Sequence, residues 1–560
     1  MILATLASIV LVAGIAFSLS GVALEKLGLE PAESVVAGAV LALAGSWCVA
    51  WSVFVSGLPL GLYGLVPLIA GASYAWGWRG ILRLSADRSA RGLVVGQVIV
   101  TSWCVLFLAF VREHTGGPWA GDWLEHWERV RFFQRSWPLD RPFIGVYALP
   151  ARPPLANTLE AAFVSVTGGG YAAFQVVTTV FCSLAYLPVA LLASRFGGGR
   201  SARIAAVLLM ASPLFMENAT FPWTKLQAVF FILSGLYFFL RAGDRARDPV
   251  APAFVAGVAL GAAAVTHYSA GPYLVVIAVA WCAAGLRRGW DRRYVRATLG
   301  AVAAGAVPLA LWFLWSIRHY GTSGTFLSNS SVSMMRGNQG SRLATMAMNL
   351  WYSVVPPQVR GLESNLLDQS SPWGTLRDQL FVLYQMNLLF AFGSLGWIAI
   401  AREAVRTPRA AAVFWVACVG GIVAVSFTTY LEPGYFGIAQ LCLQPVVLLG
   451  LAFLASRWDG LGPAWRAVVI AGCGIDLCLG IALNFAVEDL AFDRWLHPSL
   501  GVAEVARGYS LIAQTNMNAK ESTHLQFFAD AVPLGQGVVG VFLGAILCLA
   551  VARSRRGVAT

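Results

Sequence analysis

The sequence predicts an all-α protein that crosses a membrane many times, and three observations carry this prediction. Of the 560 residues, 58% are hydrophobic and only 12% are charged, whereas soluble domains carry about 25% charged residues. The mean hydropathy is +0.69. Apolar stretches of about 20 residues, the length that a helix needs to cross the hydrocarbon core, recur along the chain, and short arginine-rich segments separate many of them.

The net charge of +12 is typical of proteins that bind nucleic acid, but its distribution indicates a membrane topology. The arginines gather in short segments between apolar stretches, as they do in cytoplasmic loops of membrane proteins. We therefore expect no nucleic acid partner and a multi-pass protein of the inner (plasma) membrane. Only Lys26, Lys225 and Lys520 of the 39 basic residues are lysines, a bias that we interpret as GC-rich, bacterial coding.

The first spans set the orientation. Spans are predicted over 2–24, 35–57, 59–78 and 93–111. Arg79, Arg83, Arg88 and Arg91 fall between the last two, which places that segment in the cytoplasm. The span over 93–111 then leads out of the cytoplasm, so the polar segment that follows it faces the extracytoplasmic side.

The same alternation continues to the end of the chain. Further spans are predicted over 171–194, 204–215, 226–240, 253–266, 271–286, 298–317, 380–401, 411–429, 438–456, 468–486 and 533–552. The total is about fifteen spans, with the N-terminus outside and the C-terminus in the cytoplasm, because every arginine cluster falls on one side. Long polar segments collect on the outer side, at 114–170, 318–379 and 487–531.

The segment 114–170 is the longest polar interruption in the N-terminal half, and it carries the candidate chemistry. After Asp122, tryptophans and phenylalanines alternate with glutamates and arginines up to Trp137. This pattern predicts an amphipathic helix in the membrane interface that begins near Asp122. Pro153 and Pro154 favour an extended stretch that ends in a second helix over 155–166.

The order of several motifs resembles a known enzyme module. An acidic residue that opens an aromatic helix is followed by Arg152-Pro-Pro-Leu, by a span, and by an inner turn Arg195-Phe-Gly-Gly-Gly-Arg200. Ala211-Ser-Pro-Leu-Phe, Thr224-Lys225 and the run from Gly257 to His267 come next. This succession is similar to the GT-C glycosyltransferase module of lipid A aminoarabinose transferases and protein O-mannosyltransferases, and it covers residues 93–318.

The resemblance implies a division of the chain and also shows departures. Residues 1–92 are expected to form accessory helices, 93–318 the GT-C module with its catalytic loop 114–170, 319–379 an outer loop, and 380–560 C-terminal helices with the outer segment 487–531. The module's first span usually opens the chain in this family, whereas three spans precede it here. Asp122 is followed by Trp123 where many members carry a second acid, and His267 stands where they carry Lys or Arg.

The activity that the resemblance implies is inverting transfer of a sugar from a polyprenyl-phosphate donor to a lipid, glycan or protein acceptor at the outer membrane face. Such a reaction needs a carboxylate to accept the proton of the attacking hydroxyl. Asp122 matches the family's first-loop aspartate by position, and capping of the loop helix is its alternative role. Glu125 is a second catalytic candidate, or a capping-box partner one turn later.

Four basic residues near the outer ends of the module helices are candidates for binding the donor phosphate: Arg152, Lys225, His267 and Arg318. The alternatives are a lysine that snorkels at a helix start and a histidine that is hydrogen-bonded in the interface. Glu217 is a candidate to share a divalent cation, Mg²⁺ or Mn²⁺, with Asp122, or else is a solvated acid. A metal requirement stays open at this stage.

A different class of function, a transporter or flippase of lipid-linked or small polar substrates, is the main alternative. Transporters commonly show internal repeats and broken helices at the bilayer midplane, and the two halves of this sequence show no repeat. The ionisable residues also gather at a membrane face rather than within the spans. Both features favour the enzyme, and a polymerase or ligase of surface polysaccharide is a third alternative that changes only the acceptor.

Overall fold

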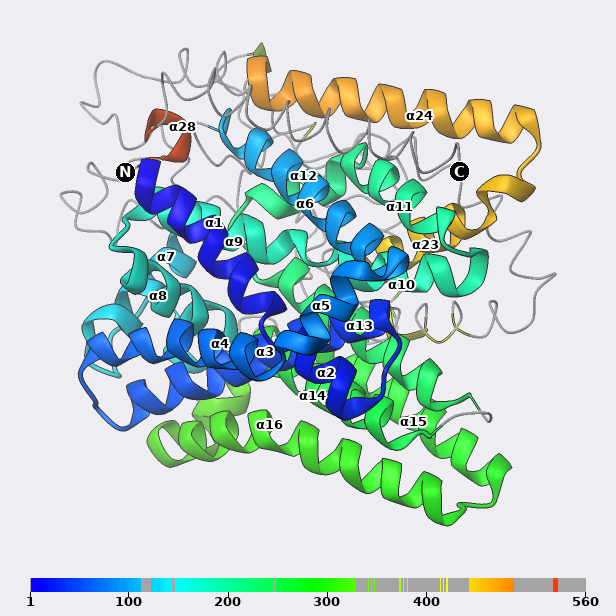
Figure 1. The fold of residues 1–560 in the computed structure, drawn as a ribbon. Coiled ribbons are helices and arrows are strands. Elements are labelled where there is room, and N and C mark those ends of the chain that lie inside the picture. Colours follow the sequence, from blue (N-terminus) through cyan, green and yellow to red (C-terminus); the bar gives the residue numbers. More distant parts are fainter. Residues whose placement is uncertain are drawn as a thin grey trace.

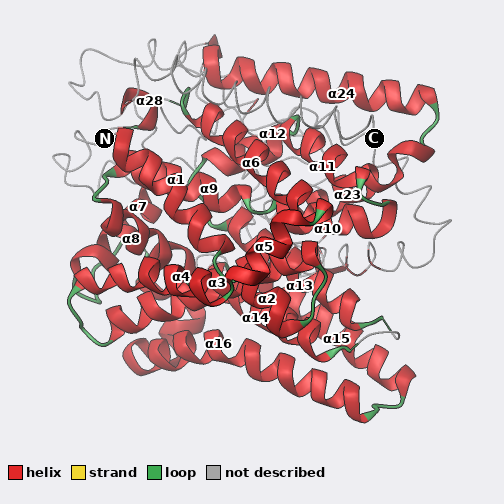
Figure 2. Cartoon of the chain, in the orientation of Figure 1, coloured by secondary structure: helices red, strands yellow, loops and turns green. Residues whose placement is uncertain are grey.

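The computed structural model describes residues 2–111, 122–143, 147–244, 248–328, 443–487 and 527–531, with isolated positions between 341 and 421. The predicted spans over 380–401, 411–429 and 533–552 lie wholly or largely outside these residues, as does most of the outer segments over 319–379 and 487–531. The described part is helical (Figure 2), and its β structure is one isolated bridge between Phe143 and Tyr147.

The described helices up to residue 327 fall into two groups, one before residue 122 and one that begins there. The first group is α1 (Ile2–Phe17), α2 (Ser20–Leu27), α3 (Pro31–Val55), η1 (Leu60–Gly64), α4 (Leu65–Trp76), α5 (Trp78–Ala86) and α6 (Arg88–Leu108). The second group is α7 (Asp122–Arg135), η3 (Leu149–Ala151), α8 (Leu155–Thr167), α9 (Tyr171–Ser183), α10 (Tyr186–Gly197), α11 (Arg200–Met210), α12 (Pro213–Thr220), α13 (Lys225–Ala242), α14 (Val250–Thr266), α15 (Ala270–Arg288) and α16 (Arg292–Leu327).

The described C-terminal elements are fewer. They are α23 (Gln444–Arg457), η8 (Trp458–Gly460), α24 (Pro463–Ala482), a π-helical turn η9 (Leu483–Val487) and α28 (Phe528–Ala531). Among the described residues, 8 helices are long and apolar enough to cross a membrane, or up to 10 if each bent pair is one span. The prediction of a multi-pass helical protein is confirmed, whereas the predicted total of spans also involves residues outside the described ranges.

Two predicted features differ in their local structure. The arginine-rich segment between the third and fourth spans is helical: α5 carries Arg79 and Arg83, and the side chain of Asp87 caps α6 by accepting hydrogen bonds from Ser89 and Ala90. The span predicted over 204–215 is instead a pair of helices, α11 and α12, bent by 70°. The bend occurs at Pro213, which cannot continue the hydrogen bonding of α11 and starts α12.

The helices differ in how deeply they are enclosed. In the most apolar segment of each candidate span, all residues of α9 and α10 are buried and 89% of those of α13 are buried. In α16 and α24 only 22% of these residues are buried. In Figure 1, α16 and α24 run along opposite edges of the molecule. Their exposed apolar side chains include Leu314 and Ile470, and an exposed apolar surface of this kind fits contact with lipid.

The N-terminal helices share one hydrophobic core with the rest of the described chain. Helix α3 packs against α8 and α14, and α1 packs against α8 and α9. The Trp51 ring in α3 meets Trp312 of α16 edge-on, with centroids 5.6 Å apart, and its Nε1 donates to the Leu311 carbonyl. The helices before residue 93 therefore pack directly against the helices that carry the candidate site.

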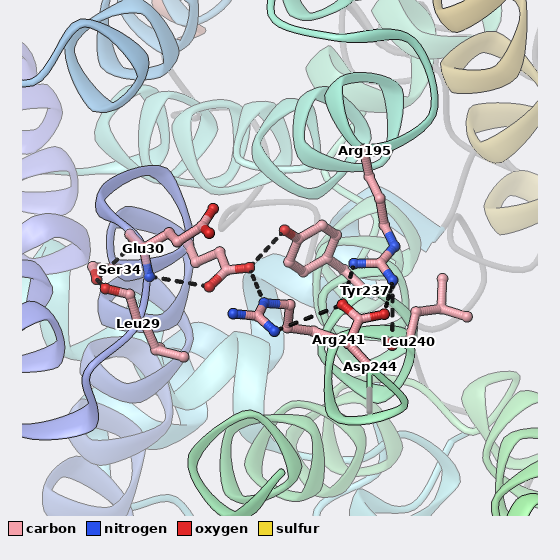
Figure 3. A network of polar contacts seen from close by, with 9 residues as sticks. Leu29, Glu30, Ser34, Arg195, Tyr237, Leu240, Arg241 and Asp244 are labelled. Atoms are coloured by element: carbon pink, nitrogen blue, oxygen red, sulfur yellow. Dashed lines mark hydrogen bonds and ion pairs between the residues drawn. The ribbon is translucent and has the colours of Figure 1, made fainter. Parts of the chain in front are cut away.

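A network of charged side chains, drawn in Figure 3, ties α3 to α13 and α10; Glu33 and Arg241 are buried, whereas Asp244 is 40% exposed. The carboxylate of Glu33 accepts a hydrogen bond from the Tyr237 hydroxyl at 3.0 Å and forms an ion pair with Arg241. Asp244 pairs with Arg195 of α10 at 2.8 Å. Because the Glu33 and Arg241 side chains are almost fully enclosed, this network fixes the helices relative to one another.

Candidate active site

Helix α7 begins at Asp122, as the sequence predicts, and its first turn holds both candidate carboxylates, Asp122 and Glu125. The positive end of the helix dipole favours negative charge at this position. The helix is more enclosed than an interfacial helix, because its polar as well as its aromatic side chains are covered. Its buried residues are Trp123, Leu124, Glu125, His126, Trp127, Arg129, Val130, Phe132 and Phe133.

Glu125 is held between two guanidinium groups. Arg129 Nε donates to Glu125 Oε1 at 2.8 Å, and Arg152 NH2 lies 3.4 Å from Oε2. Burial by itself raises the pKa of Glu125, but Arg152 and Arg129 outweigh it and lower the value to about 2. Arg129 also donates to the carbonyls of Leu149 and Ala148. Glu125 is therefore an ionised anchor that holds α7, the loop before α8 and Arg152 together.

Asp122 is held more loosely. Its Oδ1 lies 3.6 Å from Arg152 NH2, its Oδ2 accepts a hydrogen bond from Trp223 Nε1 at 3.1 Å, and its side chain remains 18% exposed. Burial, together with the negative charge of Glu125, raises the pKa of Asp122 against the opposing effect of Arg152 and Lys225. A carboxylate with a raised pKa and an open side is suited to accept a proton.

Lys225 brings a third cation to the same place. It is the first residue of α13, and its Nζ lies 4.4 Å from the centroid of the Trp223 ring, whose N–H binds Asp122. The positive charge of Lys225 acts on the pKa values of both Asp122 and His267. Trp223 thus lies between Asp122 and Lys225, a role that no local sequence pattern indicates.

His267 ends α14 in an extended conformation. Its Nδ1 accepts a hydrogen bond from the backbone N–H of Ser269 at 3.1 Å and lies 2.8 Å from the Ser269 hydroxyl. Burial, with Lys225 and Arg152 nearby, lowers the pKa of His267 well below its usual value. The side chain therefore joins the site as a neutral imidazole and not as the cation that a phosphate ligand would suggest.

A second polar network, also absent from the sequence prediction, lies behind Asp122 and Glu125. His126 Nδ1 lies 3.2 Å from Asn157 Oδ1, and Asn157 Nδ2 donates to Glu160 Oε2 at 3.1 Å. Thr178 and Gln227 donate to the other oxygen of Glu160 at 3.0 and 2.7 Å. This network connects α7 and α8 with α9 and α13.

Two further predicted site residues lie on helices α16 and α12. Arg318 is exposed on α16. Glu217 is buried on α12. Within the described residues, no group of three or more His, Cys, Asp or Glu side chains is arranged to hold a metal ion.

Comparisons with known proteins concern the fold. No protein-family model matches the chain, and no curated protein matches it. Among solved structures, it is similar to ArnT from Cupriavidus metallidurans bound to undecaprenyl phosphate, at 17% identity, covering 78% of each chain with a TM-score of 0.45.

Two further solved structures are similar. The apo form of the same ArnT is 18% identical, with 79% of this chain and 74% of that chain covered and a TM-score of 0.43. The apo oligosaccharyltransferase of Archaeoglobus fulgidus is 15% identical, with 77% and 61% covered and a TM-score of 0.39. The solved structures to which this chain is similar are thus an ArnT and an oligosaccharyltransferase.

Proposed function

We propose that this chain is a membrane glycosyltransferase that moves a sugar from a polyprenyl-phosphate donor to a hydroxyl of a lipid, glycan or protein acceptor at the extracytoplasmic face. One observation carries the proposal. Asp122 is partly exposed and has a raised pKa, and it lies beside the cations Arg152 and Lys225 in an otherwise enclosed cluster. A base next to two cations matches a reaction in which a hydroxyl attacks and a phosphate leaves.

In the proposed reaction, Asp122 is the general base. Its carboxylate accepts the proton of the acceptor hydroxyl while the oxygen bonds to the anomeric carbon. The bond between the anomeric carbon and the phosphate oxygen breaks, and the lipid phosphate leaves with the electron pair. The single displacement inverts the anomeric configuration and leaves Asp122 protonated.

Arg152 and Lys225 stabilise the negative charge of the departing phosphate. A guanidinium can bind two phosphate oxygens at once, and an ammonium adds a compact charge. Glu125 acts through Arg152: it holds one side of the guanidinium at 3.4 Å while Asp122 faces it at 3.6 Å. In this assignment Glu125 is a positioning residue, and its enclosed carboxylate leaves the proton transfer to Asp122.

We infer the carrier class from the cations Arg152 and Lys225, which we propose to bind a phosphate in this membrane protein. The ArnT structure named above is bound to undecaprenyl phosphate, a lipid of the class that we propose as the donor carrier here. Arg318 stays a predicted phosphate ligand, as Glu217 stays a predicted metal ligand.

The test is sugar transfer in proteoliposomes supplied with a radiolabelled pool of bacterial polyprenyl-phosphate sugars and with membrane lipid and glycan acceptors. We expect wild-type protein to transfer label and Asp122→Asn at matched expression to lose transfer while it still binds the donor lipid. Equal transfer by the variant would overturn the role of Asp122. Movement of donor lipid across the bilayer without any transfer would favour a flippase instead.

A further inference from the structure

Helix α5 turns sharply away from the helix before it. The helix pair Leu60–Trp76 and Trp78–Ala86 is bent by 71°, and Gly77 lies between the two parts. The outer side of α4 is apolar and open, because Leu68 is 69% exposed and Ile69 is 48% exposed, which fits contact with lipid chains. Helix α5, which lies between α4 and α6 in Figure 1, therefore runs at a steep angle to a helix with an open apolar side.

Two glycines fix the orientation of α5 about its own axis. A Cβ atom on Gly80 would collide with the carbonyl group of Gly21 in α2, and a Cβ atom on Gly77 would lie 2.7 Å from the backbone nitrogen of Val22. The backbones of α5 and α2 are therefore in direct contact, and α2 itself packs against α3. The side of α5 that carries Gly80 faces the protein, and the opposite side faces outward.

The outward side of α5 is divided into an apolar row and a basic row. Trp78 and Leu82 are about one turn apart, and their side chains are 53% and 57% exposed. Arg79 and Arg83 each follow one of these residues in sequence, and both are exposed. Because each residue advances the helix by about 100°, the two arginines form a row beside the two apolar side chains.

This division is typical of a helix that lies in the membrane interface. Such a helix places its apolar side among the acyl chains and its basic side chains at the headgroups. Trp76 ends α4 and Trp78 begins α5, and both indoles are exposed. Tryptophans are enriched at the interface between membrane and water, so the bend itself fits that depth. The sequence predicts this segment on the cytoplasmic side, where the leaflet contains anionic lipids.

The guanidinium groups of Arg79 and Arg83 are open to an external anion. Within the described part of the chain, neither group forms a salt bridge, in contrast to Arg195, which pairs with Asp244. The Arg79 guanidinium lies 5.6 Å from the centroid of the Trp78 ring, so it stays next to the apolar row. Two unpaired positive charges beside an apolar row complement a molecule that carries a negative headgroup and an acyl chain.

We propose that α5 is a binding site for an anionic phospholipid of the cytoplasmic leaflet. Arg79 and Arg83 bind the phosphate, and Trp78 and Leu82 contact the acyl chains. A guanidinium can donate two hydrogen bonds to one phosphate. A zwitterionic headgroup carries its own cation, which opposes these arginines, so the site favours lipids with a net negative charge. The contact with α2 holds both rows at the interface, and a bound lipid therefore connects this bend to the N-terminal helices.

The test is lipid binding by the full-length protein in detergent, measured by native mass spectrometry. The added lipid is dioleoyl phosphatidylglycerol or dioleoyl phosphatidylcholine. We expect the wild type to bind phosphatidylglycerol more tightly, and the double variant Arg79→Gln with Arg83→Gln to lose about 30-fold in affinity for it, at about fivefold for each arginine. Arg79→Lys with Arg83→Lys keeps the charge and should retain most of the binding. Added salt should weaken binding by the wild type, because exposed charges are screened.

Arg292→Gln with Arg293→Gln is the matched control, because it removes the same charge from two exposed arginines at the start of α16. Its affinity for phosphatidylglycerol should stay near that of the wild type. An equal loss in both double variants would show that net charge alone attracts the lipid and would overturn the site. A wild type without preference for phosphatidylglycerol would also overturn it and would favour an acidic protein as the partner of α5. Lipid binding is measured without a sugar donor, so the outcome does not depend on the proposed transfer reaction.

Discussion

The ion pairs Glu33–Arg241 and Asp122–Arg152 use the same kinds of side chain in two different ways. The Glu33 and Arg241 side chains are 3% and 7% exposed, and the Tyr237 hydroxyl donates to the same carboxylate. Asp122 and Arg152 are 18% and 15% exposed, their nearest atoms are 3.6 Å apart, and Arg152 is shared with Glu125. A closed pair joins helices, whereas an open and shared pair leaves room for a ligand.

The difference explains why burial alone does not identify a site. Both regions hold buried carboxylates and arginines, and both connect helices that are distant in sequence. Of these two regions, only the one around Asp122 has an indole N–H that donates to the carboxylate and a lysine above the same indole. We therefore expect the Glu33–Arg241 pair to stabilise the fold and the Asp122–Arg152 pair to take part in the reaction.

The largest effect on stability should come from Glu33→Ala. Removing one partner of a buried ion pair leaves the other charge uncompensated, which costs about 3–5 kcal/mol. Thermal unfolding in detergent should show a strongly lowered midpoint. Sugar transfer per folded molecule should stay near that of the wild type. A loss of transfer without a lowered unfolding midpoint would contradict a purely structural role for the Glu33–Arg241 pair.

Lys225→Gln should act mainly on the donor. A hydrogen bond to a charged group contributes about 1.5–3 kcal/mol, so the donor KM should rise by about 10- to 150-fold. Lys26→Gln is the matched control, because Lys26 is an exposed lysine in the last turn of α2. A donor KM that does not respond to Lys225→Gln would remove this lysine from the proposed phosphate site.

The pH dependence of transfer should report Asp122. Burial and Glu125 raise its pKa above the ordinary value of about 4. Once protonated, the carboxyl cannot accept a proton, so transfer should fall about tenfold per pH unit as the pH drops through this raised pKa. A profile that stays flat down to the ordinary carboxyl range would argue against Asp122 as the base.

Glu125 should show its effect at lower pH and on stability. Its folded pKa of about 2 lies below the unfolded value, so its ion pairs stabilise the fold above the unfolded pKa, and this stability is lost as the pH falls through about 2. Acid unfolding through this group should therefore occur below the acid limb of transfer.

The smallest effect should come from Arg200→Ala. Arg200 and Asp459 form an ion pair in which the side chains are 64% and 63% exposed. Exposed pairs contribute about 0–1 kcal/mol, so the unfolding midpoint and the transfer rate should both stay close to those of the wild type. A large destabilisation by this variant would show that enclosure does not decide the strength of these pairs.

Much of the candidate site could be predicted from the sequence, because its charged residues interrupt apolar stretches at the ends of predicted helices. An acid opening α7, a basic residue before two prolines and a lysine at a helix start are visible as breaks in apolar sequence. In the structure Asp122 contacts Arg152, and Trp223 lies between Asp122 and Lys225. The neutral state of His267 could not be predicted, because it depends on burial and on nearby charges.

Other features depended on tertiary contacts that no local pattern contains. Alternating aromatic and charged residues in α7 look the same whether the polar face meets lipid headgroups or buried partners, and the structure supplies Arg152 and Asn157 as partners. Trp223 and Glu160 act through residues of α7 and α8 that are distant in sequence. Arg318 was predicted from its place near the outer end of a span, which does not determine the direction of its side chain.

The most direct test of the central claim compares single-turnover sugar transfer by Asp122→Asn and Glu125→Gln at saturating donor. We expect Asp122→Asn to slow the transfer step by about 10²–10⁴-fold, the usual contribution of a general base, with donor affinity unchanged. Glu125→Gln should weaken donor binding and stability and slow the transfer step much less. If Asp122→Asn transferred sugar at the wild-type rate, or if Glu125→Gln alone abolished the step, the assignment of the open carboxylate as the base would be contradicted.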